Sequence, residues 1–325
     1  MIDQAARLRA ILHGQTVDRP PLWDPWFAMG RFLRDHYQGD YLSMAEDLGH
    51  AAVPVGIIRT AVDFFDHHRF QAACTRPGGL MRHSSQKVDD ADPYWDEQLR
   101  GARQGTQVVH EVGRLTWITF KWCFDAISGA MGLTDLALAC YDQPGSVAEA
   151  MDWVERRNRA AIRHIVPESN VDFVLFEGNC AYQAGPMIEP SMLRQFCFEP
   201  TRRTLDLLRN MGVPFAFHTE GLLAPVMPML IELGFACVHG CDPQANDLGA
   251  LVEQWGDRIA LAGNMDVAML ATATPEQVTA ATRRMLDLGS ARGRFIASPN
   301  TAIQDDVPAE NYIAMCRAVD AWAAG

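Results

Sequence analysis

Short apolar runs alternate with amphipathic stretches through the second half of the chain. They predict buried strands at residues 171–176, 213–218, 235–239, 258–262 and 294–298. Pro214 lies at the start of the second run, where a missing backbone donor is tolerated. Strands separated by helical segments are typical of βα units around a parallel sheet.

The segments between these strands carry helix signals. Ser146 and Glu149 have the spacing of a capping box, as do Thr274 and Gln277, and such a box satisfies free backbone N–H groups at a helix start. Behind each box, apolar residues recur near the helical period of 3.6. We interpret these stripes as core packing without a ligand role.

The first half of the chain is less regular. After an N-terminal helix, residues 18–23 read as a turn into a first strand, and further strands are predicted at 51–58 and 115–120. Residues 75–112 are rich in Gly, Pro, Asp, Gln and Arg, which predicts a long insertion or small hairpins. About eight strands result, so we predict a single (β/α)8 barrel over residues 1–325 with an N-terminal helical extension. A doubly wound sheet is the alternative, because the number of strands does not prove closure.

Composition excludes several classes of protein. Hydrophobic residues make up 48% of the chain and charged residues 21%, as in ordinary globular proteins. The net charge of −12 argues against a nucleic-acid partner, whose phosphates need a basic face. The apolar runs are too short to span a bilayer, and the N-terminal residues lack the layout of a signal peptide. Eight scattered cysteines without a CxxC pair predict free thiols in a reducing compartment, which favours a cytoplasmic protein without a Cys-rich structural zinc site.

In a barrel of this kind the active site lies at the carboxyl ends of the strands. His218 and Glu220 are two residues apart at such an end, so their side chains share one face if the strand continues. Together they suit two metal ligands, or a general base and the group that orients it. The simpler alternative is a hydrogen-bonded pair without a metal.

Aromatic and polar residues near other strand ends are candidates for a substrate pocket. Aromatic residues follow the first and third predicted strands, and they form a wall for a flat apolar substrate if they face the mouth rather than the core. Arginines that neutralise a substrate carboxylate and asparagines that orient the substrate are further candidates. The substrate-binding candidates are Trp23, Trp26, Phe27, Arg31, Arg59, Trp122 and Asn264, and Asn179 is a candidate to orient substrate during catalysis.

Five short motifs lie, in order, at residues 18–21, 185–190, 218–221, 263–266 and 306–311. Together they resemble the uroporphyrinogen decarboxylase superfamily and its corrinoid-dependent methyltransferase branch, which includes coenzyme M methyltransferases and O-demethylase subunits. The resemblance implies a distorted (β/α)8 barrel, and it is best over residues 145–320.

Departures from the superfamily pattern narrow the expected chemistry. Decarboxylases of the superfamily carry an arginine-rich segment after the first strand, and here Phe27 stands where a substrate-binding arginine would be, with only Gly30 and Arg31 retained. The decarboxylase aspartate after the second strand falls near Ile58 and Arg59, where no carboxylate is present. The resemblance therefore argues against a substrate with many carboxylates.

The coenzyme M methyltransferases bind zinc through His-x-Cys and a later cysteine. Carried over, His218 keeps the histidine, whereas Glu220 and Thr301 replace the two cysteines. Related cobalamin-independent methionine synthases add a carboxylate one strand later, near Asp242. The resemblance thus implies a metal triad of His218, Glu220 and Asp242, with Cys241 as substitute, and a harder centre than a thiolate site.

Three functions remain open from the sequence. The first is a methyltransferase that moves a methyl group between a small O-, N- or S-methyl compound and a corrinoid, with zinc at the triad. The chain has no corrinoid-binding DxHxxG motif, so cobalamin would arrive on a partner protein or as free cofactor. The second is a metal-independent decarboxylase or lyase, with His218 and Glu220 in acid–base roles and Arg31 or Arg59 holding a carboxylate. The third is a non-catalytic binding protein.

Overall fold

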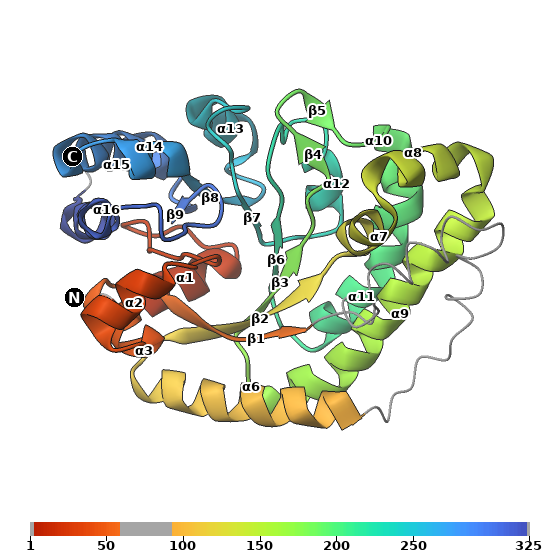
Figure 1. Cartoon of the computed structure of the whole chain (residues 1–325), viewed down its shortest axis with the longest axis horizontal. Helices are drawn as coiled ribbons and strands as arrows, with labels where there is room; N and C mark the ends of the chain where they lie inside the picture. The colour runs from red at the N-terminus through yellow and green to blue at the C-terminus, as the bar shows by residue number, and fades with distance from the viewer. Residues whose placement is uncertain (1–2, 59–92, 324–325) are drawn as a thin grey trace.

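The computed structural model describes residues 3–58 and 93–323, and its centre is a curled parallel sheet. The strands follow one another in chain order around the sheet, with helices packed outside them (Figure 1). The strands of this sheet are β1 (Ala52–Ile58), β2 (Leu115–Lys121), β3 (Phe173–Glu177), β6 (Phe215–His218), β7 (Cys237–His239), β8 (Ala260–Met265) and β9 (Phe295–Pro299). A small antiparallel hairpin is formed by β4 (Ala181–Tyr182) and β5 (Gly185–Pro186).

A short extended segment around Leu22 joins the two edges of the sheet. Leu22 forms parallel bridges to both His50 and Ala297. Its carbonyl accepts from Ala51 N at 2.7 Å, and Trp23 N donates to the carbonyl of Ala297 at 3.0 Å. Through these bonds the segment around Leu22 serves as the eighth strand of the barrel wall, between β9 and β1. The predicted barrel is thereby confirmed. The strand order has no reversal point, so the doubly wound alternative is wrong.

Helices cover the outside of the sheet. Those in the first half of the chain are α1 (Gln4–Leu12), α2 (Gly30–Tyr37), α3 (Tyr41–Asp47), α6 (Pro93–Glu111), α7 (Cys123–Met131), α8 (Leu133–Asp142) and α9 (Pro144–Ser169). Those in the second half are α10 (Pro190–Leu193), the π-helical turn η2 (Arg194–Phe198), α11 (Glu199–Asn210), α12 (Met227–Glu232), α13 (Leu248–Trp255), α14 (Val267–Thr272), α15 (Pro275–Gly289), the 3-10 turn η3 (Ser290–Arg292) and α16 (Ala309–Ala321). The predicted capping box at Thr274 is present, with the Gln277 backbone donating and its side chain accepting. The box predicted at Ser146 is wrong, because α9 begins two residues earlier, at Pro144, and has no side-chain cap.

Helix α6 corrects the expectation of an insertion or hairpins at residues 75–112, of which 75–92 lie outside the described residues. Its buried residues Trp95, Ala102, Thr106 and Val109 are seven, four and three positions apart, which places them on one helical face. The many polar residues between them belong to the exposed face, and they hid the period in the sequence. Gly105, inside the helix, faces the side chain of Val55 on β1.

Two separate cores result from this arrangement. One fills the space between the sheet and the outer helices. The other lies inside the barrel, and α1 closes its amino end, with Leu8 and Ile11 fully buried in the same cluster as Trp117 and Phe173. Alternate residues of each strand therefore enter different cores.

The described residues agree with two expectations from composition. Among them, no single helix has the length and apolarity to cross a bilayer, and α7 with α8 meets that test only as a pair bent by 105°. The cysteines from Cys123 to Cys316 are all free and buried. Cys74 lies outside the described residues.

Candidate functional site

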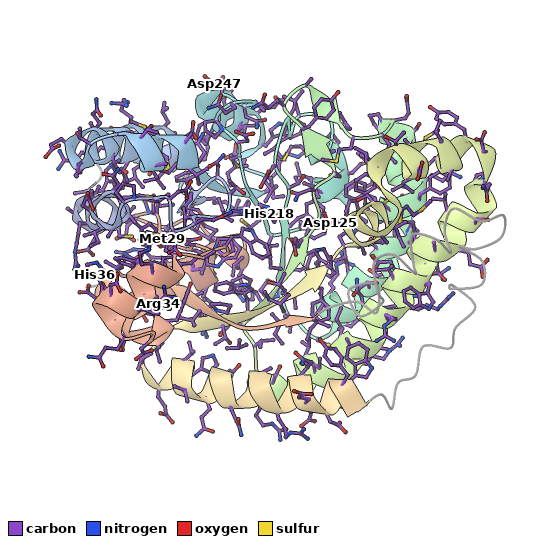
Figure 2. All side chains as sticks on the ribbon, viewed as in Figure 1. Met29, Arg34, His36, Asp125, His218 and Asp247 are labelled. Carbon is purple, nitrogen blue, oxygen red and sulfur yellow. The ribbon has the colours of Figure 1, made fainter. Side chains whose placement is uncertain are left out.

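A row of polar residues ends four neighbouring strands. Lys121 pairs in register with Glu177, Glu177 with His218, and His218 with His239. Residues two positions earlier on three of these strands, Leu175, Ala216 and Cys237, belong to the core inside the barrel. Because residues i and i+2 of a strand face the same side, the row also points inward, at the carboxyl end of the barrel, which we call the mouth. In Figure 2, His218 lies near the centre of the molecule, whereas Arg34 and His36 lie out on α2.

His218 is buried and bonded to a second histidine. Its Nδ1 lies 2.8 Å from Nδ1 of His239, and Nε2 of His239 lies 2.8 Å from the hydroxyl of Ser298 on β9. Burial lowers the pKa of His218 to about 3, and burial with the neighbouring His218 ring lowers the pKa of His239 well below its usual value. Both rings are therefore neutral near pH 7.

Glu220 lies beside the other nitrogen of His218. Its Oε1 is 3.9 Å from His218 Nε2, and the hydroxyl of Thr301 donates to the same oxygen. Its backbone N–H donates to Oδ1 of Asn179 at 3.4 Å. The predicted group of His218, Glu220 and Asn179 thus comes together, and Thr301 joins it.

The backbone turn after Glu220 fixes the position of that residue at the mouth. Gly221 has a φ of +79°, and a side chain there would lie 2.6 Å from the backbone of Tyr182 on the β4–β5 hairpin. Leu222 N also donates to the carbonyl of Tyr182. The close approach requires glycine, and it packs the hairpin against the rim of the mouth.

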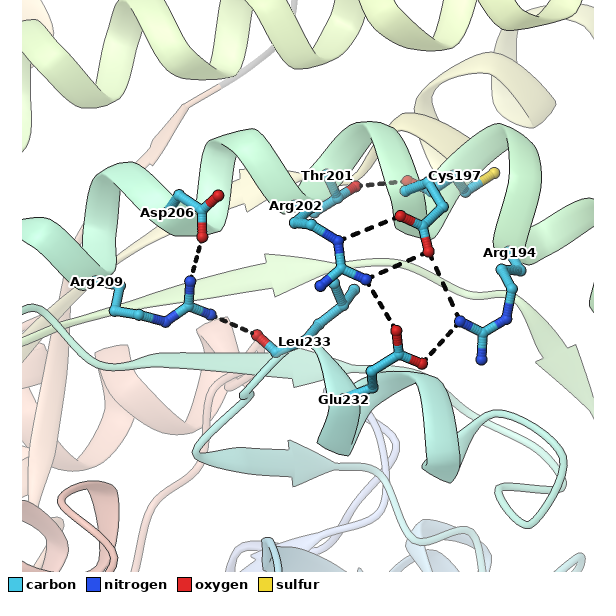
Figure 3. Close-up of polar contacts among 9 residues, drawn as sticks. Arg194, Cys197, Thr201, Arg202, Asp206, Arg209, Glu232 and Leu233 are labelled. Carbon is cyan, nitrogen blue, oxygen red and sulfur yellow. Dashed lines mark hydrogen bonds and ion pairs between the residues drawn. The ribbon is translucent and has the colours of Figure 1, made fainter.

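An ion-pair network on the outside holds the helices that flank β6. Arg194 and Arg202 both reach Glu232 of α12, at 2.8 and 2.9 Å, and Arg202 also contacts Glu199 (Figure 3). These side chains are each about half exposed, so each pair contributes little singly. The network ties η2 and α11 to α12, on either side of the strand that carries His218.

The structure does not bring Asp242 into the predicted metal triad. Its Oδ1 accepts from the backbone of Gln244 at 2.9 Å and from the Asn300 amide at 3.5 Å, so the carboxylate stabilises its own turn. The substitute, Cys241, is fully buried, and burial raises the pKa of its thiol to about 12. Across residues 3–58 and 93–323, no three His, Cys, Asp or Glu side chains form a group that suits a metal.

The remaining donors do not fit a catalytic zinc centre. Such centres use three protein ligands, each a thiolate, imidazole or carboxylate. His218 and Glu220 supply two, and the third position is the neutral hydroxyl of Thr301, which already donates to Glu220. We therefore derive no chemical step through zinc at this site.

Among the aromatic residues predicted to line the pocket, Trp26 contacts His218. Its ring packs edge-on against His218, with centroids 5.3 Å apart. Trp23 is fully buried inside the barrel against Trp117, and Trp122 is fully buried with its Nε1 donating to Thr201. Phe27 packs between Tyr41 and Tyr312. Trp23 and Trp122 are therefore core residues, and Phe27 is half-buried and packs against the core.

The polar residues predicted to bind substrate do not gather at one place. Arg31 is exposed on α2, and its backbone N–H donates to Asp305. Arg59 lies outside the described residues. Asn264 is half-buried near the end of β8 and pairs in register with Ser298.

Sequence reasoning gave no role to His239, Ser298 or Glu177, although each lies at the end of a predicted strand. Glu177 and His239 lie in register with His218, and Ser298 contacts His239, but a single sequence reveals neither relation. Lys121, beside Glu177 in the row, forms an ion pair with Asp125 of α7 at 3.3 Å.

Asp24 positions the loop that carries Trp26. Its Oδ1 accepts from Trp26 N at 3.1 Å, and its Oδ2 accepts from the hydroxyl of Tyr312 at 3.0 Å. The same hydroxyl lies 2.9 Å from Nε2 of His50. All three side chains are buried, and burial raises the pKa of Asp24 from 3.8 to about 7.

Asp24→Asn is expected to change how stability depends on pH. The folded protein keeps the Asp24 proton where the unfolded chain has lost it, so stability from this group is present below pH 3.8 and declines up to about pH 7. Asparagine keeps an acceptor for Trp26 N and carries no charge. Between about pH 5 and pH 8, the wild type should lose roughly 2 kcal/mol of unfolding free energy relative to the variant. Urea unfolding measures it, with exposed Asp35→Asn as control; parallel pH curves for all three proteins would contradict the assignment.

Comparison with known proteins gives a family match and several structural likenesses. The uroporphyrinogen decarboxylase (URO-D) family model matches residues 120–322. A search of the curated proteins finds no match to this chain. Among solved structures, a methyltransferase from Methanosarcina mazei is 15% identical with a TM-score of 0.75, over 98% of this chain and 99% of that one.

Two further structures show lower similarity. An endo-β-1,4-xylanase from Gloeophyllum trabeum is 9% identical with a TM-score of 0.50, over 90% of this chain and 96% of that one. A B12-independent methionine synthase from Shewanella sp. W3-18-1 is 12% identical with a TM-score of 0.47, over 67% and 64% of the two chains. The likenesses at 0.50 and above establish the fold, and the chemistry has to be argued from side chains.

Proposed function

This chain belongs to the uroporphyrinogen decarboxylase family, and from that premise we propose that it is a methyl-transferring enzyme of the family. It moves a methyl group between a small O-, N- or S-methyl compound and a corrinoid. The corrinoid acts as a co-substrate, which arrives on a partner protein or free in solution. The match to a methyltransferase from Methanosarcina mazei is in keeping with this proposal.

One observation carries the proposal. The methyltransferase branch has a histidine and two cysteines at the positions of His218, Glu220 and Thr301. Here the retained histidine and the two replacements meet at the mouth, where Glu220 lies 3.9 Å from His218 and accepts a hydrogen bond from Thr301. The location of the reacting groups is thus kept while the thiolates are replaced by a carboxylate and a hydroxyl.

The chain's own residues handle a proton in this reaction. When a methyl leaves an oxygen, nitrogen or sulfur atom X for the corrinoid, the X–C electron pair stays on X, which then takes up a proton; in the reverse direction X–H loses that proton as X attacks the methyl. Glu220 is placed to give or accept it, because its carboxyl group lies at the mouth and Thr301 fixes one oxygen. Trp26 covers the His218 ring and supplies an apolar surface beside it.

Decarboxylation of a substrate with many carboxylates is disfavoured by the residues at the mouth. Phe27 packs in the core at the position of a substrate-binding arginine, and Arg31 is exposed on α2. These two positions give a substrate with many carboxylates no arginine partner.

A methyl-transfer assay tests the proposal. Wild type is mixed anaerobically with cob(I)alamin and a panel of methylated aromatics, amines and thioethers, and methylcobalamin formation is followed by absorbance. Glu220→Gln should lower kcat by about 10²-fold or more, as expected for loss of a proton-transfer group. Exposed Glu253→Gln on α13 is the matched control and should behave as wild type. Release of CO₂ from a carboxylated compound without methyl transfer, or no turnover by the wild type, would overturn the proposal.

A further inference from the structure

Helix α9 carries two buried polar residues that have no part in the proton transfer assigned to Glu220. Glu155 and Asn158 are 0% and 1% exposed, and they lie three positions apart, on one side of the helix. Burial of such groups costs free energy unless they are hydrogen-bonded. Their partners therefore indicate what this side of the helix holds in place.

Both residues connect to the end of β2 at the mouth. The amide of Asn158 donates to the carbonyl of Lys121 at 3.1 Å. Glu155 reaches the next residue through Thr201 of α11, whose hydroxyl lies 3.0 Å from Glu155 Oε1 and accepts from Nε1 of Trp122 at 2.7 Å. Helix α9 thus holds the backbone of Lys121 and, by way of Thr201, the side chain of Trp122.

The chemistry of the indole group makes Thr201 the acceptor in this contact. An indole N–H is a donor only. The single hydrogen of the Thr201 hydroxyl has two acceptors in reach, Oε1 of Glu155 and the carbonyl of Cys197 in η2, the latter at 2.8 Å (Figure 3). Thr201 and Trp122 are both fully buried. A side chain without a hydroxyl at position 201 would therefore leave the indole N–H buried and unpaired, which is costly.

Trp122 in turn packs beside the residues that form the row at the mouth. Its backbone N–H donates to the carbonyl of Glu177 at 2.7 Å, and Gly178 N donates to the carbonyl of His218 at 3.0 Å. The Trp122 ring occupies the space beside Gly178, where an added Cβ would lie 2.7 Å from it, and it meets Phe217 edge-on with centroids 5.0 Å apart. Gly178 and Phe217 are the chain neighbours of Glu177 and His218. A displaced indole would therefore move both residues of the row.

We propose that Thr201 is a positioning residue for the mouth. It ties the indole of Trp122 to Glu155 of α9, and the indole holds the ends of β3 and β6 in their relative position. Displacement of a reacting group by about 1 Å is enough to slow catalysis by up to about 100-fold, so a remote contact of this kind affects the rate. Only the kinetic part of the test below rests on the proposed function.

Two threonines of α11 give a matched comparison. Thr201 and Thr204 are both fully buried, and both contact Glu155, the hydroxyl of Thr204 donating to Oε2 at 2.5 Å. Thr204 also accepts from Arg159 at 3.4 Å. Thr204→Val therefore removes a buried hydroxyl from the same helix while the contact between Thr201 and Trp122 remains. It is the control for a loss of stability alone.

Histidine NMR of the full chain measures the geometry of the mouth without a substrate. The ring signals of His218 are assigned with His218→Gln and then followed in each variant. We expect them to shift in Thr201→Val, and to stay near their wild-type positions in Thr204→Val and in Thr201→Ser, which keeps the hydroxyl. A shift in Thr201→Val no larger than in Thr204→Val would overturn the inference, as would an equal shift in Thr201→Ser.

A further pair of variants covers the case in which Thr201→Val does not fold. The thiol of Thr201→Cys is of similar size to the hydroxyl side chain and is a weak acceptor. Thr201→Cys should therefore shift the His218 signals less than Thr201→Val does, but more than Thr201→Ser and more than its own control, Thr204→Cys. Equal shifts in the two cysteine variants would again overturn the inference.

The methyl-transfer assay supplies the kinetic readout. Asn179 follows Gly178 and accepts from the backbone N–H of Glu220, so movement of this segment reaches the proposed proton-transfer group. Thr201→Val should lower kcat about 10-fold with little change in KM, whereas Thr201→Ser and Thr204→Val should stay within about twofold of wild type. Full kcat in Thr201→Val would contradict the positioning role. If the wild type transfers no methyl group, the proposed function falls, and the NMR comparison still decides the role of Thr201.

Discussion

Glu220→Cys combined with Thr301→Cys is expected to give this barrel a stoichiometric zinc ion. The two side chains already converge, since Thr301 donates to Glu220, and Glu220 lies 3.9 Å from Nε2 of His218. Two thiolates and one imidazole form a set that zinc prefers, with bonds of about 2.0–2.3 Å. Against the wild type, zinc affinity should rise by about 10³-fold or more, equivalent to roughly 4 kcal/mol.

Elemental analysis and competition with a chromophoric chelator measure this gain. The matched control places the second cysteine elsewhere, as Glu220→Cys with Asp242→Cys, because Asp242 caps its own turn with Gln244. That control should bind zinc far more weakly. Equal binding by both double variants would show that Asp242 belongs to the site after all, and failure of the first to bind zinc would contradict the proposed convergence.

Gly240→Ala is expected to destabilise the barrel severely. Gly240 follows His239 with a φ of +121°, and an added Cβ would lie 2.2 Å from the carbonyl oxygen of Thr219, which no rotamer change relieves. Thr219 is the neighbour of His218, so relief of the clash would separate β6 from β7 where His218 contacts His239. We expect a loss of more than about 4 kcal/mol, enough to leave little folded protein.

Thermal and urea unfolding check this expectation. Gly129→Ala is the control, because Gly129 is exposed within α7 and an added Cβ there meets no atom within 4 Å. Alanine in that helix should be neutral or stabilising by about 0.5–1 kcal/mol. If both variants unfold at the same midpoint, the backbone approach at Gly240 is looser than described.

The barrel could be predicted because its strands carry a strong local signal. All five strands expected after residue 170 are present within a few residues, since fully buried parallel strands read as continuous apolar runs. The extended segment at Leu22 was also predicted, from the turn residues before it. Helix α6 was not, because its buried face consists of few residues and includes Thr106 and Ala102, which carry little apolar signal.

The site was predictable where it is local. His218 and Glu220 share a strand end, so spacing alone placed them together. Asp242 depended on the conformation of its turn, in which the carboxylate is used by the backbone. Whether Trp23 or Trp26 faces His218 depended on where the first extended segment ends. The contacts of His239 with His218 and Ser298 depended on the pairing of neighbouring strands. Such relations arise from tertiary pairing and leave no trace in one sequence.

Helix α1 affects proton exchange at His218 and His239, which lie more than 200 positions later in the chain. Leu8 and Ile11 fill the amino end of the barrel, and Trp117 and Phe173 form a layer above them. This packed layer blocks a path for water from the amino end of the barrel to the imidazoles of His218 and His239. The protons of His218 and His239 therefore exchange with solvent by way of the mouth, and a ligand bound at the mouth would slow that exchange.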